Sequence, residues 1–175
     1  MVSILDLTMA ATTSYHYPAV YGEIGYDPSR SWTASTLDLK QYLEATFISS
    51  FVTSIATKGD PYSGTWVKEY KVDFYNESSS AWEAVLNSAT NGLVFTGNTD
   101  TNTEVAQTLY FPIYTSKVRF YPQSWTSRIG MAVKVNGYSY TYKDKNIPPG
   151  CASTSTGLST STGAPAPEIA PARFL

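Results

Sequence analysis

A two-residue alternation of apolar and polar side chains constrains the fold of this chain more than any other feature. In WVKEYKVDFY (66–75), the apolar residues that share one face of an extended strand are Tyr70, Val72 and Phe74. In RIGMAVKVNG (128–137), the corresponding residues are Ile129, Met131, Val133 and Val135. Because successive side chains of a strand point to opposite sides of a sheet, each segment predicts a half-buried strand.

Short runs of this kind recur through the first 143 residues, and no helical period of useful length interrupts them. The predicted strands are 42–49, 51–57, 66–75, 81–86, 105–113, 116–122, 128–137 and 138–143. NESSSAW, at residues 76–82, has the polar composition of a hairpin turn. Many short strands at regular spacing predict an all-β fold, either an antiparallel β-sandwich or a barrel.

Composition narrows the classes of partner. Aromatic residues make up 14% of the 175 residues and include 14 tyrosines, whereas charged residues make up 15%, which favours strands and tyrosine-lined surfaces. The formal net charge is −2, so the chain lacks the cationic field that drives binding to nucleic acid or anionic lipid. We therefore predict no nucleic-acid partner and disfavour membrane lipid.

The C-terminal segment 144–175 differs in composition from the rest. It is rich in Ser, Thr, Pro and Ala and shows no apolar period, so it cannot bury enough surface to offset the entropy of ordering. We predict a domain at 1–143 followed by a tail or linker at 144–175. The tail is either an O-glycosylated stalk or linker to another domain, or a disordered end.

The cysteine count leaves the compartment open. Cys151 is the only cysteine, so no intrachain disulfide can form, and the protein either works in a reducing compartment or folds without a bridge. The first 14 residues lack a basic leader and a sustained apolar core, so they do not resemble a signal peptide.

The segment KVRFYPQSWTSRIGMAVKVNG (117–137) resembles the closing signature of discoidin domains, also called coagulation factor V/VIII type C domains. Further matches follow in the family's order: MAATTSY (9–15), SWTAS (31–35), QYLEATF (41–47), VTSIATKG (52–59), VKEYKVDFYNESSSAWEAV (67–85) and VFTGNTDTN (94–102). The resemblance covers nearly all of residues 4–137. It departs from the family where a cysteine usually stands near each end of the domain, because both are absent here.

The resemblance implies an eight-stranded antiparallel jelly-roll β-sandwich of the galactose-binding kind, with a disordered C-terminal tail. It also implies that loops at one end bind a ligand and that the domain catalyses nothing. The corresponding loops here are 15–30, 31–38 and 58–66. In some relatives, positions that line the ligand pocket correspond to Tyr15, Thr33, Ser63 and Thr65.

These loops contain the groups that sugar recognition requires: flat apolar rings that stack on the C–H face of a pyranose, and polar groups that bond its hydroxyls. The candidate rings are Tyr15, His16, Tyr17, Tyr21, Tyr26, Tyr62 and Trp66. The candidate polar groups are Glu23, Arg30, Thr33, Asp38, Asp60, Ser63 and Thr65, with Asp27 beside them.

No catalytic group or required cofactor is indicated. His16 is the only histidine, and the sequence contains no nucleophile and base pair, no glycine-rich phosphate loop and no metal-ligand spacing. The segment GYDPSRSW (25–32) resembles the loop that holds a structural calcium in sugar-binding relatives, which makes Asp27 a possible ligand. The second carboxylate of that site is missing, because Lys134 stands in its region.

We therefore predict a noncatalytic recognition module that binds carbohydrate and serves cell adhesion. Its expected partner is a glycan or glycoprotein, and its expected location is extracellular or on the cell surface. A structural or scaffolding subunit that docks on proteins within an intracellular assembly is the alternative. The missing disulfide favours the alternative, and tyrosine-rich loops fit either function.

Overall fold

The computed structural model describes residues 2–3, 7–87 and 92–139. By its internal contacts the chain divides into residues 1–141 and 142–175, and the β structure belongs to the first unit. The predicted domain limit after residue 143, most of the predicted strand 138–143, the tail and Cys151 lie outside the described residues, so these predictions stay untested.

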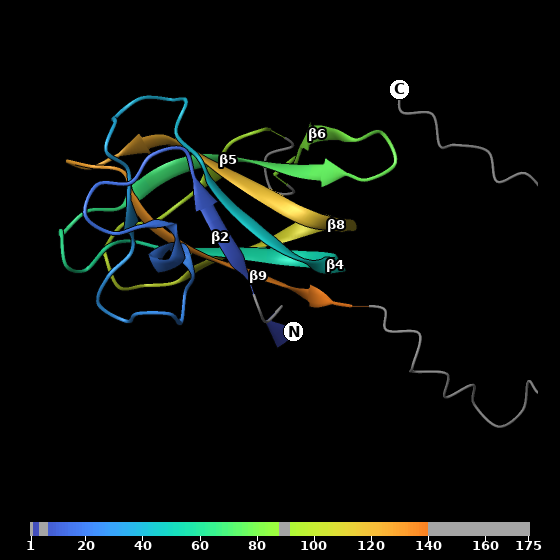
Figure 1. The fold of residues 1–175 in the computed structure, drawn as a ribbon, viewed down its shortest axis with the longest axis horizontal. Coiled ribbons are helices and arrows are strands. Elements are labelled where there is room, and N and C mark those ends of the chain that lie inside the picture. The colour runs from blue at the N-terminus through green and yellow to red at the C-terminus, as the bar shows by residue number, and fades with distance from the viewer. Residues whose placement is uncertain (1, 4–6, 88–91, 140–175) are drawn as a thin grey trace, which may run out of the picture. The chain divides into compact units, whose positions relative to one another are not determined.

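The described chain is nearly all β, as Figure 1 shows. The strands are β1 (Val2–Ser3), β2 (Thr8–Ala11), β3 (Trp32–Thr33), β4 (Leu43–Lys58), β5 (Val67–Asn76), β6 (Ala81–Ala84), β7 (Phe95–Thr96), β8 (Val105–Trp125) and β9 (Gly130–Tyr138), with one 3₁₀ turn, η1 (Ala19–Gly22). All pairings between these strands are antiparallel. The predicted all-β jelly-roll sandwich is confirmed. None of the described helical segments is long and apolar enough to cross a membrane.

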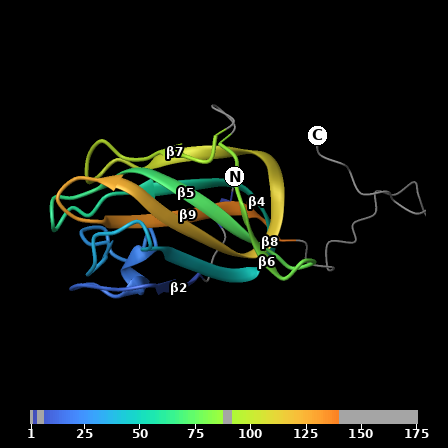
Figure 2. The same cartoon turned by 90° about the horizontal axis from the view of Figure 1, so that it is seen from above.

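Two long strands, β4 and β8, belong to both layers of the sandwich. Residues 43–46 of β4 pair with 117–120 of β8, and residues 54–57 pair with 105–108, with register shifts between these stretches. Figure 2 shows β8 bending at the right-hand side as it passes from one layer to the other. The structure therefore has two long strands where we predicted four shorter ones. Predicted strands 42–49 and 51–57 together form β4, and predicted strands 105–113 and 116–122 together form β8, because each strand bends between the layers and keeps its pairing.

The pairing of neighbours defines the layers. In one layer β2, β4, β8, β5 and β6 follow one another, and β7 pairs with β5. In the other, β8, β4, β9 and β1 follow one another, and β3 pairs with β9. The hairpin between β5 and β6 confirms the turn predicted at NESSSAW.

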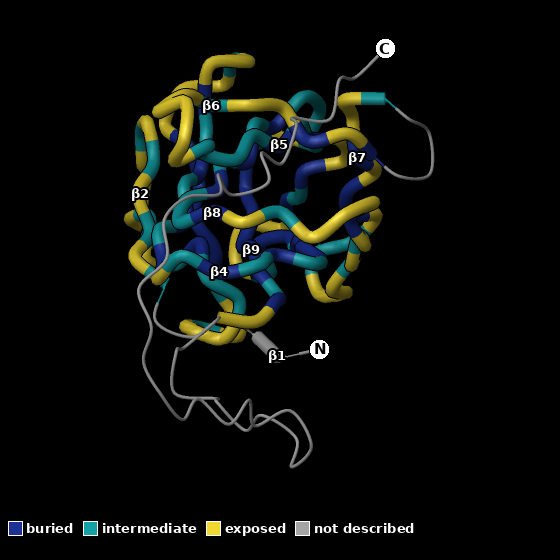
Figure 3. Tube along the Cα trace, turned by 90° about the vertical axis from the view of Figure 1, so that its right-hand side faces the viewer, coloured by how far each residue is buried: buried dark blue, intermediate teal, exposed yellow. Residues whose placement is uncertain are grey.

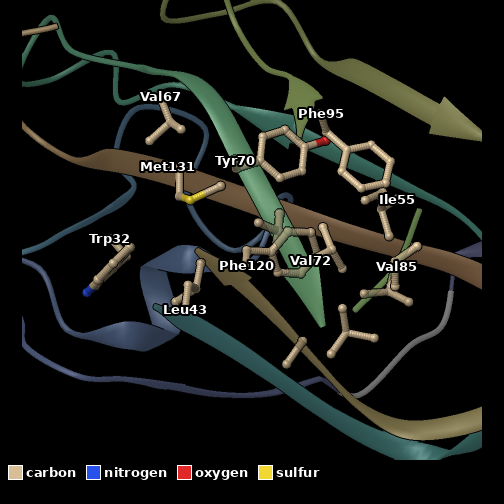
Figure 4. Close-up of a cluster of buried hydrophobic side chains, with 14 of the residues drawn as sticks. Trp32, Leu43, Ile55, Val67, Tyr70, Val72, Val85, Phe95, Phe120 and Met131 are labelled. Carbon is tan, nitrogen blue, oxygen red and sulfur yellow. The ribbon is translucent and has the colours of Figure 1, made fainter. Parts of the chain in front are cut away.

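The core lies between these layers (Figure 4). Its fully buried large side chains include Trp32, Tyr70, Phe95 and Phe120. The rings of Tyr70 and Phe95 stack with centroids 5.6 Å apart and an interplanar angle of 15°. The apolar face predicted for 128–137 is buried in full, since Ile129, Met131, Val133 and Val135 are each 0% exposed. Figure 3 shows these buried segments at the centre, with exposed loops around them.

Gly137 in β9 allows β9 to approach β4 closely. A Cβ at this position would clash with the carbonyl oxygen of Phe51, so any side chain would force the two strands apart. The glycine that ends the closing signature therefore has a packing role.

The sandwich has two different ends. The loops before β4, the loop between β4 and β5 and the turn between β8 and β9 lie at one end, on the left of Figure 1. The bends of β4 and β8 and the β5–β6 turn lie at the other. The three predicted ligand loops are thus at the same end, which we call the loop end.

Candidate ligand-binding site

Asp60 joins two of the predicted loops. Its buried carboxylate accepts hydrogen bonds from the backbone N–H of Ser31 at 3.0 Å and of Ser63 at 3.2 Å. The hydroxyl of Ser31 donates to the carbonyl of Gly59 at 2.8 Å. Because buried backbone amides require partners, this carboxylate fixes loop 58–66 against the start of β3.

Thr65 joins the same loop to the turn between β8 and β9. Its hydroxyl donates to the carbonyl of Arg128 at 2.5 Å and accepts from the Arg128 backbone N–H at 3.2 Å. The backbone N–H of Trp66 donates to the hydroxyl of Thr126 at 3.1 Å. Loop 15–30 is held as well, because the backbone N–H of Tyr15 donates to the carbonyl of Thr33 at 2.8 Å.

Six of the predicted ring residues form a continuous row across the loop end. The successive centroid distances are 3.9 Å for Tyr15–His16, 6.4 Å for His16–Tyr17, 5.2 Å for Tyr17–Tyr21 and 5.1 Å for Tyr21–Tyr26, and Tyr62 lies 5.5 Å from Tyr17. We call these six side chains the aromatic row. Tyr15, Tyr26 and Tyr62 are 49%, 53% and 67% exposed, so the row presents ring surface to solvent.

Two guanidinium groups lie on this row. Arg30 lies 5.3 Å from the ring centroid of Tyr17 and 5.8 Å from that of Tyr62, and its Nε is buried without a partner among the described residues. The neighbouring Tyr17 hydroxyl raises the pKa of Arg30, which keeps the guanidinium charged. Arg128 lies 4.4 Å from the ring centroid of Tyr15. Arg30 was predicted from the sequence as a site residue, and Arg128 was not.

Three predicted ligand contacts lie beneath the surface. Thr33, Asp60 and Thr65 are 1%, 0% and 0% exposed. The side chains of Asp60 and Thr65 form hydrogen bonds with the backbone of the loops. The carbonyl of Thr33 accepts a hydrogen bond from the backbone N–H of Tyr15. These residues support the loops that carry the row, and their predicted contact with a ligand stays a prediction.

The other predicted residues are dispersed. Asp38 accepts hydrogen bonds from Nε2 of Gln41 and from the backbone N–H of Lys40, both at 2.9 Å, and these bonds lower the pKa of its carboxyl. The half-buried Trp66 packs close to Gly59, beside Thr101. Within the described residues, neither Asp38 nor Trp66 makes a ring contact or a hydrogen bond to the aromatic row.

Ser63 and Glu23 lie nearer the row. Ser63 is exposed directly after Tyr62, and its backbone is fixed by Asp60. Glu23 follows η1, where the next residue, Ile24, donates its backbone N–H to the carbonyl of Val133 at 2.9 Å. Both residues belong to the loops that the row occupies.

Asp27 does not have the surroundings of a carboxylate calcium site. Its Oδ1 accepts both the backbone N–H and the hydroxyl of Ser29 at 2.8 Å, which lowers the pKa of the carboxyl. In the described part of the chain, no three His, Cys, Asp or Glu side chains gather where they could hold a metal. Calcium takes six to eight oxygens, which include backbone carbonyls, so the lack of an acidic cluster leaves the predicted site at Asp27 untested.

The fold agrees with comparison to known proteins. Residues 10–135 match the model of the F5/8 type C domain. The chain belongs to this family. The resemblance to discoidin domains is thereby confirmed.

Relatives of this F5/8 type C chain are longer proteins. It is 26% identical to retinoschisin of Takifugu rubripes over 106 residues, which are 60% of the chain and 38% of the relative. It is 33% identical to neurexin-4 of Drosophila melanogaster over 89 residues, which are 51% of the chain and 7% of the relative. It is 30% identical to human neuropilin-2 over 115 residues, which are 63% of the chain and 12% of the relative. The chain thus spans less than two fifths of each of these relatives.

Solved structures show the same fold. Recombinant discoidin II of Dictyostelium discoideum superposes with a TM-score of 0.68 and 22% identity over 82% of this chain and 61% of that chain. The family 32 carbohydrate-binding module of C. perfringens NanJ, solved in complex with galactose, superposes with a TM-score of 0.59 and 18% identity. The match covers 76% of this chain and 93% of that chain. The family 32 module of AlyQ, solved in complex with 4,5-unsaturated mannuronic acid, superposes with a TM-score of 0.57 and 12% identity. The match covers 75% of this chain and 95% of that chain.

Proposed function

We propose that this F5/8 type C domain is a noncatalytic recognition module that binds carbohydrate through the aromatic row. The observation that carries the proposal is the contiguity of six rings, four of them exposed, with two guanidinium groups on the same surface. A ring face takes up the C–H side of a pyranose, and guanidinium N–H groups donate to sugar oxygens. The row is held by buried backbone bonds, so little loop ordering opposes binding.

The structural neighbours support this ligand class. Two of them were solved with a sugar, one with galactose and one with an unsaturated mannuronic acid. A family 89 glycoside hydrolase of Clostridium perfringens also contains the fold, and this chain covers 15% of that enzyme. In such an enzyme the matched domain is a small part of the whole, which agrees with a noncatalytic role here.

We further propose that the recognition module works outside the cell or on its surface, in cell adhesion. A recognition surface formed by exposed rings with guanidinium groups suits a polyvalent glycan coat, where several weak contacts add to a strong attachment. Secretion of the protein from cells that express its natural gene, followed by cell fractionation, tests the location.

The alternative function is a structural or scaffolding subunit that docks on proteins. One observation favours it: further aromatic side chains are exposed at the end of the sandwich opposite the row. They are Tyr110, Phe111, Tyr114 and Tyr138. Phe51 connects two of them, with centroids 5.0 Å from Tyr114 and 5.3 Å from Tyr138. Exposed aromatic patches are typical of protein interfaces.

A glycan array separates the two functions. The wild type is compared with Tyr62→Ala in the row and with Tyr110→Ala, a matched control because Tyr110 is a tyrosine of similar exposure at the other end. We expect wild-type binding to at least one glycan class, a loss of about tenfold in Tyr62→Ala because a stacking ring is removed, and no change in Tyr110→Ala. Absence of glycan binding, together with a co-purifying partner that Tyr110→Ala releases, would establish the scaffold instead.

A further inference from the structure

We propose that Arg128 makes this site select glycans that carry a carboxylate, such as uronic acid residues, over their uncharged counterparts. The inference rests on the proposed function and deepens it, because it assigns a negative charge to the ligand and names the residue that binds this charge.

The position of Arg128 is fixed at both its backbone and its side chain. Its backbone N–H and carbonyl both bond to the buried hydroxyl of Thr65. Its guanidinium lies 4.4 Å from the ring centroid of Tyr15, at one end of the aromatic row. Stacking on a ring holds a guanidinium by its face and leaves the N–H groups at its edge available to an acceptor.

The chain itself contains a stacked arginine that has a carboxylate partner. Arg119 lies 3.9 Å from the ring centroid of Trp82 and 4.3 Å from that of Tyr42, and its Nε donates to Glu44 at 2.7 Å. In that case the rings hold the guanidinium and an acidic side chain binds its edge. Arg128 has the ring but no such acid among the described residues, where the ion pairs are Arg119–Glu44 and Lys134–Glu104.

Nearby acidic side chains are already engaged. Asp60 is buried and accepts two backbone N–H groups, and Asp27 accepts two hydrogen bonds from Ser29. Arg30 is less suited to a ligand carboxylate, because its Nε is buried and Asp27 and the hydroxyls of Tyr17 and Tyr21 already act on its charge. Arg128 is therefore the cation of the loop end best placed to receive an acid from outside.

The chemistry of the ligand follows from this placement. A pyranose on the row beside Tyr15 has its substituents directed along the surface, where a carboxylate on the sugar ring can reach the edge of Arg128. Guanidinium and carboxylate form paired, charge-assisted hydrogen bonds that are about twice as strong as bonds between neutral groups. Exposed Tyr15 and His16 add donors beside the same oxygen atoms.

The test measures binding to matched glycans by calorimetry and on an array. Oligogalacturonides are compared with their methyl esters, and sialylated glycans with the same glycans after removal of sialic acid. The proteins are wild type, Arg128→Gln, Arg128→Lys and Tyr62→Ala. The control for net charge is Lys117→Gln, which removes one positive charge on β8 far from the loop end. Thermal unfolding confirms that each variant is folded.

We expect wild type to prefer at least one acidic glycan over its neutral counterpart by about tenfold or more. Arg128→Gln should weaken binding of the acidic glycan more than binding of its neutral counterpart and so abolish the preference. Arg128→Lys should keep part of the preference, and Lys117→Gln should leave it unchanged. Tyr62→Ala should weaken both forms equally. Equal wild-type binding to both forms, or a preference that Arg128→Gln leaves intact, would overturn this inference alone. Binding to no glycan at all would overturn the proposed function with it.

Discussion

The hydroxyl of Thr65 bonds to both the backbone N–H and the carbonyl of Arg128, so one buried side chain ties the β4–β5 loop to the β8–β9 turn. These two segments lie far apart in the sequence. Their connection fixes where Arg128 meets Tyr15 and therefore the geometry at one end of the aromatic row.

Replacement of Thr65 by valine keeps the shape of the side chain and removes this connection. The backbone N–H and carbonyl of Arg128, which are partly buried, then lose their partner, so we expect the free energy of unfolding to fall by about 1–3 kcal/mol. The measurement is urea denaturation, followed by glycan binding under native conditions, where affinity should also fall. Thr96→Val is the control, since Thr96 is exposed and its hydroxyl makes no hydrogen bond to a described residue. An equal effect of both substitutions would contradict the structural role of Thr65.

Asp60→Ala tests the second tie between loops. The substitution leaves the backbone N–H groups of Ser31 and Ser63 without their acceptor, and we expect a loss of about 1–3 kcal/mol by denaturant unfolding. Asp60→Asn, which retains one acceptor oxygen, should lose less. Glu104→Ala serves as the control because its ion pair with Lys134 is exposed and contributes less than about 1 kcal/mol. If Glu104→Ala cost as much as Asp60→Ala, burial would not be the cause.

The sequence predicted the fold well because the inward faces of β5 and β9 show a clean period of two. It missed the continuity of β4, because Ser49 and Ser50 look like a break between strands. In the structure this polar pair lies where β4 bends between layers, and the buried hydroxyl of Ser50 bonds to the carbonyl of Ile48 at 2.7 Å. Alternation reports which face is buried, and it does not report when a strand passes into the opposite layer.

The site was predicted in part for similar reasons. Tyrosines in irregular loops indicate an exposed surface, and six of the seven predicted rings do meet in the row. Asp60 and Thr65 proved to be buried because the backbone of a tight loop needs internal acceptors, a demand that residue types alone do not reveal. Arg128 was missed because it stands within the closing signature, and only the turn after β8 brings it to the loop end.

Calcium addition tests Asp27 directly. We expect the unfolding temperature to be the same with millimolar calcium and with a chelator, because the Asp27 carboxylate is engaged by Ser29 and is not part of an acidic cluster among the described residues. An ion that binds the folded state would raise stability in proportion to the logarithm of its concentration. A rise that Asp27→Ala abolishes would instead establish the predicted structural site.

Asp73, on the outer face of β5, should make stability depend on pH in the direction opposite to most carboxylates. Burial raises the pKa of its carboxyl above the ordinary 3.8, and Arg119 only partly counters this. A raised pKa in the folded state means that the folded protein binds the proton more tightly than the unfolded chain. The contribution of Asp73 is therefore fully present below about pH 3.8 and is lost as the pH rises through its folded pKa. Asp73→Asn removes this dependence.

The matched comparison is Asp100→Asn. Hydrogen bonds from Thr103 and Asn102 lower the pKa of Asp100, so its contribution is present above pH 3.8 and is lost as the pH falls. In urea unfolding from pH 3 to pH 7, the stability of Asp73→Asn relative to wild type should rise with pH, whereas that of Asp100→Asn should fall. Curves with the same slope for both variants would show that local burial and hydrogen bonding do not set the two pKa values as described.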